Sequence, residues 1–192
     1  MEGWAVWITG LPGSGKSTIA EALAKRLEES GIQFQTLSVD MLRRTLTPKP
    51  TYSEEERRIV YDTLVLVASL LTKNSVNVLI DATGNRRMYR NAARKKISRF
   101  MEAYVRCPLN VCVTREMKRQ ITFKAPRGIY AKAARKASLT VPGIGVPYEK
   151  PLRPEVIVDS QRLTPSQSAE KIFRKVAREF GQRQSRSGGL NE

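Results

Sequence analysis

The sequence contains no histidine, only two cysteines and few aromatic residues, which make up 7% of its 192 positions. Without an imidazole, any mechanism that needs a histidine base is excluded, so carboxylates, lysines or bound water must handle protons. Cys107 and Cys112 alone cannot complete a zinc site, and we interpret them as buried, reduced thiols.

Long hydrophobic runs are also missing. The N-terminal apolar stretch at residues 4–9 is far shorter than the roughly 20 residues of a membrane span, and it lacks the basic flank of a signal peptide. We therefore expect a cytoplasmic protein without membrane association.

Charge, in contrast, is abundant and mostly of one sign. Lysine and arginine number 34 against 18 acidic residues, which gives a formal net charge of +16. Such a chain attracts polyanions, whether nucleotides, nucleic acid or an anionic membrane surface. We interpret the charge as a solvated basic surface that contains a phosphate-binding cluster, with a nucleic-acid site as the alternative. Adaptation to a hot habitat would enrich charged residues in the same way.

Strand and helix patterns alternate along one expected domain, residues 1–181. The expected strands are residues 4–9, 34–39, 76–80, 100–106 and 156–158, and the expected helices are residues 17–30, 40–46, 53–73, 86–98, 109–116, 129–137 and 164–180. This order predicts an α/β fold with a parallel, mostly five-stranded sheet, helices on both faces, and ligands at the carboxyl ends of the strands. We expect residues 182–192 to form a disordered basic tail.

Two of the expected helices begin with the spacing of a capping box. Ser53 and Glu56 have this spacing, and so do Thr164 and Gln167. In the helix that begins at Ser53, we expect the core-facing stripe to consist of Ile59, Leu64, Val67, Leu70 and Leu71.

Residues 10–17 carry the most specific motif of the chain. They read Gly-Leu-Pro-Gly-Ser-Gly-Lys-Ser, which is a P-loop motif, and they lie between an expected strand and an expected helix. In such a loop backbone N–H groups surround phosphates, the lysine reaches the β- and γ-phosphates, and the hydroxyl binds magnesium. We therefore predict a three-layer P-loop NTPase or nucleotide-kinase-like fold that uses ATP and Mg²⁺. The predicted ATP-binding residues here are Gly10, Leu11, Pro12, Gly13, Ser14, Gly15, Lys16, Ser17 and Thr18, with Ser17 as the metal ligand.

Asp40 and Arg43 follow the second expected strand on one helical face. A carboxylate there suits an acceptor hydroxyl, and the arginine suits an anionic group of the same acceptor. Asp40 fits equally well as a simple helix cap. Solvated helix positions would likewise explain Arg57, Arg58, Arg86, Arg87 and Arg90.

Several segments resemble adenylyl-sulfate kinases. Residues 7–20 contain W-x-T-G-L-P-G-S-G-K-S-T-I-A, where that family usually has W-F-T-G-L-S-G-(A/S)-G-K-S-T-I-A. Further similar segments follow in the same order and spacing: FMEAYVRCPLNVC at residues 100–112, PRGIY at 126–130, GIGVPYE at 143–149 and PEVIVD at 154–159. The resemblance thus covers most of the chain.

The resemblance implies an activity and a set of residues. These kinases transfer the γ-phosphate of MgATP to the 3′-hydroxyl of adenosine 5′-phosphosulfate, which yields 3′-phosphoadenosine 5′-phosphosulfate and ADP during sulfate assimilation. It implies that Lys16 and Asp40 are catalytic, that Arg115 binds ATP, that residues 115–137 form a lid, and that the protein is a homodimer. The acceptor-binding residues that it implies are Asp40, Arg43, Arg57, Arg87 and Ile144.

The chain departs from the family pattern at positions that concern the acceptor. Ser38 and Val39 replace the first Asp and the Gly of the D-G-D motif, and Val60 replaces the Asn of D-R-E-E-N. Val141 stands where the family has the aromatic residue of F-T-G-I. We therefore expect a weaker platform for stacking the adenine.

A second departure follows the third expected strand. Residues 81–87 read DATGNRR in place of A-F-I-S-P-Y-R, so Gly84 replaces the serine that some members phosphorylate, and residues 117–125 look like an insertion. The D-A-T sequence resembles P-loop kinases acting on nucleic-acid ends and small alcohols, where an Asp after this strand helps to place the acceptor. Two alternatives therefore stay open: a kinase for another hydroxyl, such as a polynucleotide 5′-end or RNA, and a non-catalytic ATP-dependent binding module.

Overall fold

The computed structural model describes residues 1–118, 130 and 140–181. Within these residues five parallel strands form one sheet in the order β2-β3-β1-β4-β5. The strands are β1 Ala5–Thr9, β2 Phe34–Ser38, β3 Asn77–Asp81, β4 Phe100–Arg106 and β5 Val156–Asp159. The helices are α1 Lys16–Glu29, α2 Val39–Leu46, α3 Glu54–Lys73, α4 Arg87–Lys96, α5 Leu109–Lys118 and α7 Pro165–Phe180. The predicted α/β fold is confirmed.

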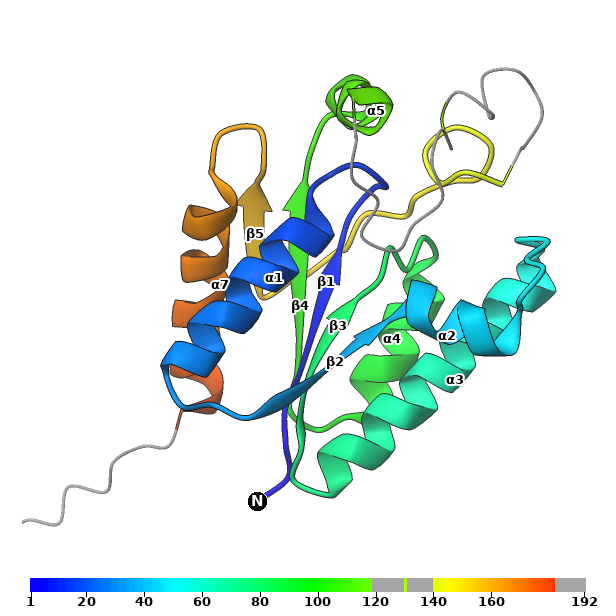
Figure 1. Ribbon diagram of the computed structural model, residues 1–192. Coiled ribbons are helices and arrows are strands. Elements are labelled where there is room, and N and C mark those ends of the chain that lie inside the picture. Colours follow the sequence, from blue (N-terminus) through cyan, green and yellow to red (C-terminus); the bar gives the residue numbers. More distant parts are fainter. Residues whose placement is uncertain (119–129, 131–139, 182–192) are drawn as a thin grey trace, which may run out of the picture.

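The sheet has a separate apolar core on each face. Helices α1 and α7 cover one face, and α3 and α4 cover the other (Figure 1). Alternate residues of β1 show the division, because Val6 and Ile8 lie in the α1–α7 core whereas Ala5 and Trp7 lie in the α3–α4 core. Apolar side chains on both faces are typical of a parallel strand covered by helices on both sides.

The core-facing side of α3 differs from the prediction. Leu64 is buried as expected, but Ile59 and Leu70 are 50% and 53% exposed. The buried apolar residues of this helix are Val60, Tyr61, Leu64, Val65 and Ala68, and Val67 and Leu71 of the predicted stripe are partly buried against the same core. Apolar residues occur around most of α3, so their periodicity alone does not determine which side faces the sheet.

Only one of the two expected capping boxes forms. Thr164 accepts from the N–H of Gln167 at 3.2 Å, and the Gln167 side chain accepts from the N–H of Thr164 at 2.9 Å. Ser53 accepts from the N–H of Glu56 at 3.1 Å, but the Glu56 carboxylate accepts instead from the N–H and hydroxyl of Thr51, at 2.5 and 2.7 Å. The acidic side chain of that motif is therefore used in the loop before α3.

Several expectations lie outside the described residues. They are the tail at 182–192, the helix at 129–137 apart from Tyr130, and the lid beyond residue 118 apart from the same tyrosine. Tyr130 is 1% exposed, and its hydroxyl donates to the carbonyl of Pro12 at 2.9 Å. Among the described helices, none has the length and apolar character needed to span a membrane.

Candidate active site

The loop between β1 and α1 has the backbone that a phosphate cradle requires. Gly13 has φ +74°, and a Cβ added to it would lie 2.4 Å from the carbonyl oxygen of Cys112. Gly15 is the N-cap of α1 in a left-handed conformation, and the first turn of α1 contains no acidic residue. The N–H groups at this helix end are therefore not neutralised by a carboxylate of the first turn, which suits an anion.

The polar side chains of this loop fit a bound triphosphate. Lys16 is 8% exposed and donates from Nζ to the carbonyl of Leu11 at 2.9 Å, so it lies folded along the loop. The Ser14 hydroxyl is buried without a hydrogen-bond partner in the described part of the chain. Ser17 and Thr18 are exposed on the first turn of α1. The loop thus presents an ammonium and hydroxyls to one small region.

The donor set also fits magnesium brought by a nucleotide. The Ser17 hydroxyl is a hard oxygen ligand of the kind that Mg²⁺ prefers. Among the described residues, no group of three or more His, Cys, Asp or Glu side chains could hold a metal ion. Most of the ligands would therefore have to come from phosphate and water, as is usual for Mg²⁺ in kinases.

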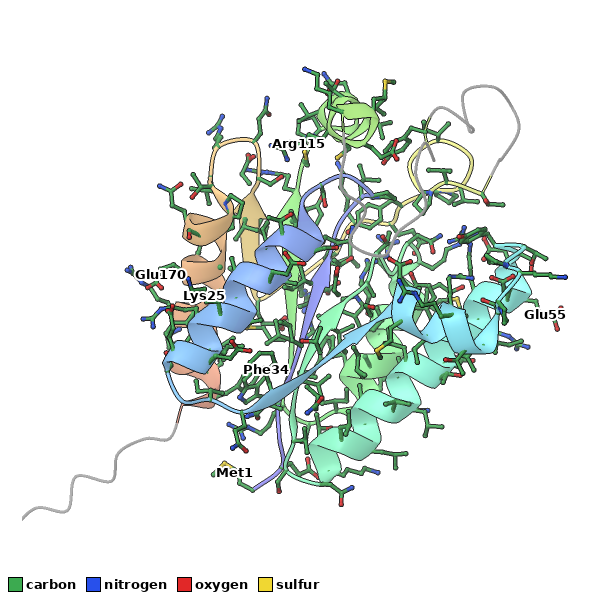
Figure 2. The ribbon with its side chains drawn as sticks, viewed as in Figure 1. Met1, Lys25, Phe34, Glu55, Arg115 and Glu170 are labelled. Carbon is green, nitrogen blue, oxygen red and sulfur yellow. The ribbon has the colours of Figure 1, made fainter. Side chains whose placement is uncertain are left out.

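A hollow of about 420 Å³ opens beside the first turn of α1. Its walls are that turn, residues 160–165 and Arg115 of α5. Arg115, which is labelled in Figure 2, donates to the hydroxyl of Ser160 at 3.1 Å and to its carbonyl at 2.7 Å. These bonds connect α5 to the loop after β5. The predicted ATP ligand Arg115 therefore borders a space next to the phosphate loop.

Asp40 lies in the first turn of α2, but it is not the cap of that helix. Ser38 is the N-cap, and its hydroxyl accepts from the N–H of Met41 at 3.1 Å. The interpretation of Asp40 as a simple cap is therefore wrong. Burial raises the pKa of the nearby Tyr52, and the negative charges of Asp40 and Glu56 add to the increase.

Arg43 and Arg57 meet around one tyrosine. Their guanidinium carbons lie 4.7 and 5.9 Å from the ring centroid of Tyr52. Arg43 pairs with Glu56, and Arg57 donates to the carbonyl of Thr140 and, at 3.1 Å, to that of Tyr52. Arg57 is only 5% exposed, and burial lowers its pKa. The interpretation of Arg57 as a solvated helix residue is therefore wrong.

Arg87 lies at the N-terminus of α4 and contacts the segment before β5. Its N–H donates to Glu149 Oε2 at 2.8 Å, which lowers the pKa of Glu149. The neighbouring Arg86 pairs with Glu149 at 3.5 Å and with Glu54 of α3 at 3.4 Å. This chain of contacts connects Arg87 to the helix that carries Arg57.

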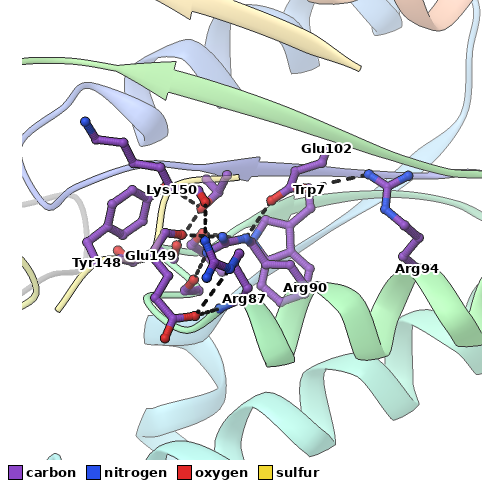
Figure 3. A network of polar contacts seen from close by, with 12 residues as sticks. Trp7, Arg87, Arg90, Arg94, Glu102, Tyr148, Glu149 and Lys150 are labelled. Atoms are coloured by element: carbon purple, nitrogen blue, oxygen red, sulfur yellow. Dashed lines mark hydrogen bonds and ion pairs between the residues drawn. The ribbon is translucent and has the colours of Figure 1, made fainter. Parts of the chain in front are cut away.

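Arg90 organises a buried network behind these residues. It is 1% exposed, so the solvated interpretation is wrong here too. Its Nε lies 2.5 Å from Glu102 Oε1, and its terminal nitrogens donate to the carbonyls of Gly84 and Glu149 (Figure 3). Burial raises the pKa of Glu102 despite the positive charges of Arg90 and Arg94. The network fastens the loop after β3 to the segment before β5.

Thr9, the last residue of β1, extends this connection to the phosphate loop. Its hydroxyl donates to the carbonyl of Thr83 at 2.6 Å and lies 3.0 Å from the hydroxyl of Tyr148. The ring of Tyr148 stacks on Tyr104 of β4. The end of β1, the loop after β3, β4 and the segment before β5 are therefore in contact at Thr9, the residue that precedes Gly10.

Ile144 belongs to a turn that packs on the phosphate loop. It is 46% exposed, and a Cβ added to the neighbouring Gly143 would lie 2.8 Å from the side chain of Leu11. Val141 of the same turn is buried in a cluster with Cys112 and Tyr130. The side chain of Val141 is therefore used for packing between this turn and α5.

Sequence reasoning missed several residues of this edge. Tyr52 and Glu56 gave no signal beyond a loop and a helix cap. Glu102 stood inside an apolar strand pattern, and Tyr148 and Glu149 belonged to a matched motif without an assigned role. Their contacts join positions far apart in the chain, which local patterns do not report.

Comparison with known proteins identifies the family. The model of the family described as adenylylsulphate kinase matches residues 2–159. A probable adenylyl-sulfate kinase of Pyrococcus abyssi is 41% identical over 181 residues, 94% of this chain and 98% of that protein. The adenylyl-sulfate kinase of Rippkaea orientalis is 37% identical over 175 residues, 91% of this chain and 92% of that protein.

A solved structure agrees with these sequence comparisons. The Mycobacterium tuberculosis APS kinase CysC, in complex with AMPPNP and APS, has a TM-score of 0.80 and 30% identity over 91% of this chain and 98% of that one. The chain therefore belongs to the adenylylsulphate kinase family.

Proposed function

We propose that this protein phosphorylates the 3′-hydroxyl of adenosine 5′-phosphosulfate with ATP, giving 3′-phosphoadenosine 5′-phosphosulfate and ADP. The observation that carries the proposal is that a phosphate loop, the carboxylate of Asp40 and a set of buried arginines occupy one edge of the sheet in a member of this family. The relatives named above supply the acceptor, since they are named adenylyl-sulfate kinases and one was solved with APS.

The donor would lie along the first turn of α1. In this proposal residues 10–18 hold the phosphates, Ser17 binds magnesium, and the adenosine fills the hollow beside Arg115. Magnesium supplies positive charge to the γ-phosphoryl group, and Lys16 adds its ammonium to the same group.

The acceptor would lie on the side of α2 and α3. Asp40 orients the 3′-hydroxyl, whose oxygen attacks the γ-phosphorus as the bond to the β-phosphate oxygen breaks. Arg43, Arg57 and Arg87 bind the phosphate and sulfate, and Ile144 borders the nucleotide. Each of these arginines is engaged within the protein, so acceptor anions would exchange with contacts such as those to Glu56 and Glu149.

Coupled ADP release tests the reaction. With MgATP we expect turnover that depends on adenosine 5′-phosphosulfate and falls about 10²-fold or more in Asp40→Ala, with ATP affinity retained. Asp62→Ala, on the exposed side of α3, is the matched control and should keep full activity. Transfer to a 5′-hydroxyl oligonucleotide without turnover of the sulfated nucleotide would contradict the proposal and favour an end-kinase. ATP binding without transfer to either would favour a non-catalytic module.

We also propose a cytoplasmic homodimer. Three large apolar side chains of α3, Ile59, Leu66 and Leu70, are 50%, 51% and 53% exposed and lie on one side of the helix. They are the first candidates for contact between two copies. Light scattering of the purified protein, repeated with Leu66→Lys, tests this arrangement, and a monomeric wild-type protein would contradict it.

A further inference from the structure

The carboxylate of Glu56, in the first turn of α3, binds groups from two separate elements. Its Oε2 accepts from the N–H and the hydroxyl of Thr51, at 2.5 and 2.7 Å, and from the N–H of Tyr52 at 3.2 Å. Its other oxygen, Oε1, pairs with Arg43 of α2. Donors from the loop before α3 and from α2 therefore converge on this one side chain.

The ion pair between Glu56 and Arg43 is shielded from water. The two side chains are only 10% and 8% exposed. Burial by itself would raise the pKa of Glu56, but hydrogen bonds from Thr51 and the charge of Arg43 lower it. Charge-assisted contacts of this kind hold a guanidinium in a defined orientation more firmly than an exposed ion pair does.

The turn that Glu56 binds has an unusual backbone. Tyr52 has a φ of +57°, a left-handed conformation that is rare for an aromatic residue. Such a conformation persists only where the surrounding contacts enforce it. Here the contacts come from Glu56 and from Arg57, whose Nε donates to the carbonyl of Tyr52 at 3.1 Å. The ring that this turn presents lies against the guanidinium groups of Arg43 and Arg57.

The same groups lie close to the proposed catalytic carboxylate of Asp40. Arg43 follows Asp40 by three residues on α2, and the charges of Asp40 and Glu56 both act on the hydroxyl of Tyr52. We propose that Glu56 is a positioning residue of the acceptor site, which sets the turn at Tyr52 and orients Arg43 beside Asp40. When an acceptor anion takes Arg43, the second oxygen of Glu56 still holds the turn. This inference rests on the proposed function, since it assigns a residue to the same acceptor site.

The kinetics of Glu56→Gln test the assignment. A carboxamide has a single acceptor oxygen, so it cannot bind Arg43 with one oxygen and the turn with the other. We expect the KM for adenosine 5′-phosphosulfate to rise about 10-fold or more while kcat stays within about 3-fold, because contacts made before and in the transition state are lost alike. The affinity for ATP should not change. Glu56→Asp, which keeps the charge, should give a KM between those of the wild type and Glu56→Gln, and Glu55→Gln, at the exposed neighbouring position, should match the wild type.

Hydrogen exchange supplies a readout that needs no acceptor. In Glu56→Ala, which removes both oxygens, the amides of Thr51 and Tyr52 should exchange about 10-fold faster or more, as measured by mass spectrometry of peptides that span residues 47–57. Unchanged exchange or an unchanged KM would overturn the inference. A lower KM in Glu56→Gln would overturn it too, because Glu56 would then only compete with the acceptor for Arg43. If the wild type does not turn over the sulfated nucleotide, the proposed function fails and the assignment to that acceptor fails with it, whereas the exchange rates still show whether Glu56 holds the turn.

Discussion

Glu102 is a buried carboxylate with one close and one more distant arginine partner. It is 5% exposed, and its ion pair with Arg90 spans 2.5 Å, whereas Arg94 lies 3.7 Å away with a partly exposed side chain. Desolvation of such a pair offsets much of its attraction, so the pair adds little net stability. Removing one partner is different, because an uncompensated charge then stays in the core.

Arg90→Met should therefore lower the free energy of unfolding by about 3 kcal/mol. The substitution keeps an unbranched side chain but leaves Glu102 and the carbonyls of Gly84 and Glu149 without their donor. Urea unfolding monitored by tryptophan fluorescence measures the loss. The double variant Arg90→Met with Glu102→Gln should recover part of it, and a single variant as stable as the wild type would contradict the argument.

The loss in Arg90→Met should also depend on pH. Burial raises the pKa of Glu102, so the folded protein binds this proton more tightly than the unfolded chain does. The stability that the group contributes is present below the ordinary carboxyl pKa and is lost as the pH rises through the raised value. Because removing Arg90 raises the pKa further, the destabilisation should be larger at about pH 7 than at about pH 4.

For individual residues, the sequence predicted the part of the candidate site that is contiguous in the chain. It did not predict the contacts between residues that lie far apart in the chain. The phosphate-loop residues are contiguous, so a motif specifies them together. The assignments of Asp40 and the arginines came from a resemblance and remain proposals. Arg90, Glu102 and Tyr148 gave no comparable signal, because their network joins three elements that only the fold brings together.

Among the elements, the loop between β1 and α1 is the most constrained. Gly13 has a left-handed φ of +74°, and its backbone lies against the backbone of Cys112. A Cβ at Gly13 would clash with the carbonyl oxygen of Cys112, and no side-chain rotation could relieve that clash. Gly13→Ala should shift the loop and weaken ATP binding about 10-fold or more, since about 1–3 kcal/mol of strain falls on the phosphate site. Isothermal titration with ATP measures the change.

Gly31, after the end of α1, is the matched control. It has a similar φ of +69°, but a Cβ there would meet nothing within 4 Å. Gly31→Ala should cost about 1–2 kcal/mol of stability without changing ATP affinity. Equal ATP affinities in the two variants would show that the contact with Cys112 does not constrain the loop.

Element positions were predictable where apolar runs end at Gly, Asp or Pro. β4 agrees with its predicted bounds, and β1, β2, β3 and β5 agree within one residue at each end. The orientation of α3 was not predictable, because its sequence has apolar residues on most sides and the sheet selects among them. The capping box at Ser53 failed because Thr51 and Arg43 compete for the Glu56 carboxylate.

For the whole molecule, the net charge of +16 should appear in the rates of encounter with nucleotides. The association rate of ATP and of adenosine 5′-phosphosulfate should fall several-fold from low to high potassium chloride, while kcat changes little. Stopped-flow fluorescence measures the association rates. A steep salt dependence for an oligonucleotide, steeper than for the nucleotides, would instead favour a nucleic-acid partner.

The hydroxyl of Thr9 has a consequence for how two ligands influence each other. It contacts Thr83 after β3 and Tyr148 before β5, and it immediately precedes Gly10 of the phosphate loop. An acceptor that moves the segment of Tyr148 therefore acts on the strand end that carries the donor site. Thermodynamic linkage makes this effect reciprocal. If bound acceptor changes the affinity for ATP by some factor, bound ATP changes the affinity for the acceptor by the same factor. The Thr9 hydroxyl is then one connection through which such coupling would pass.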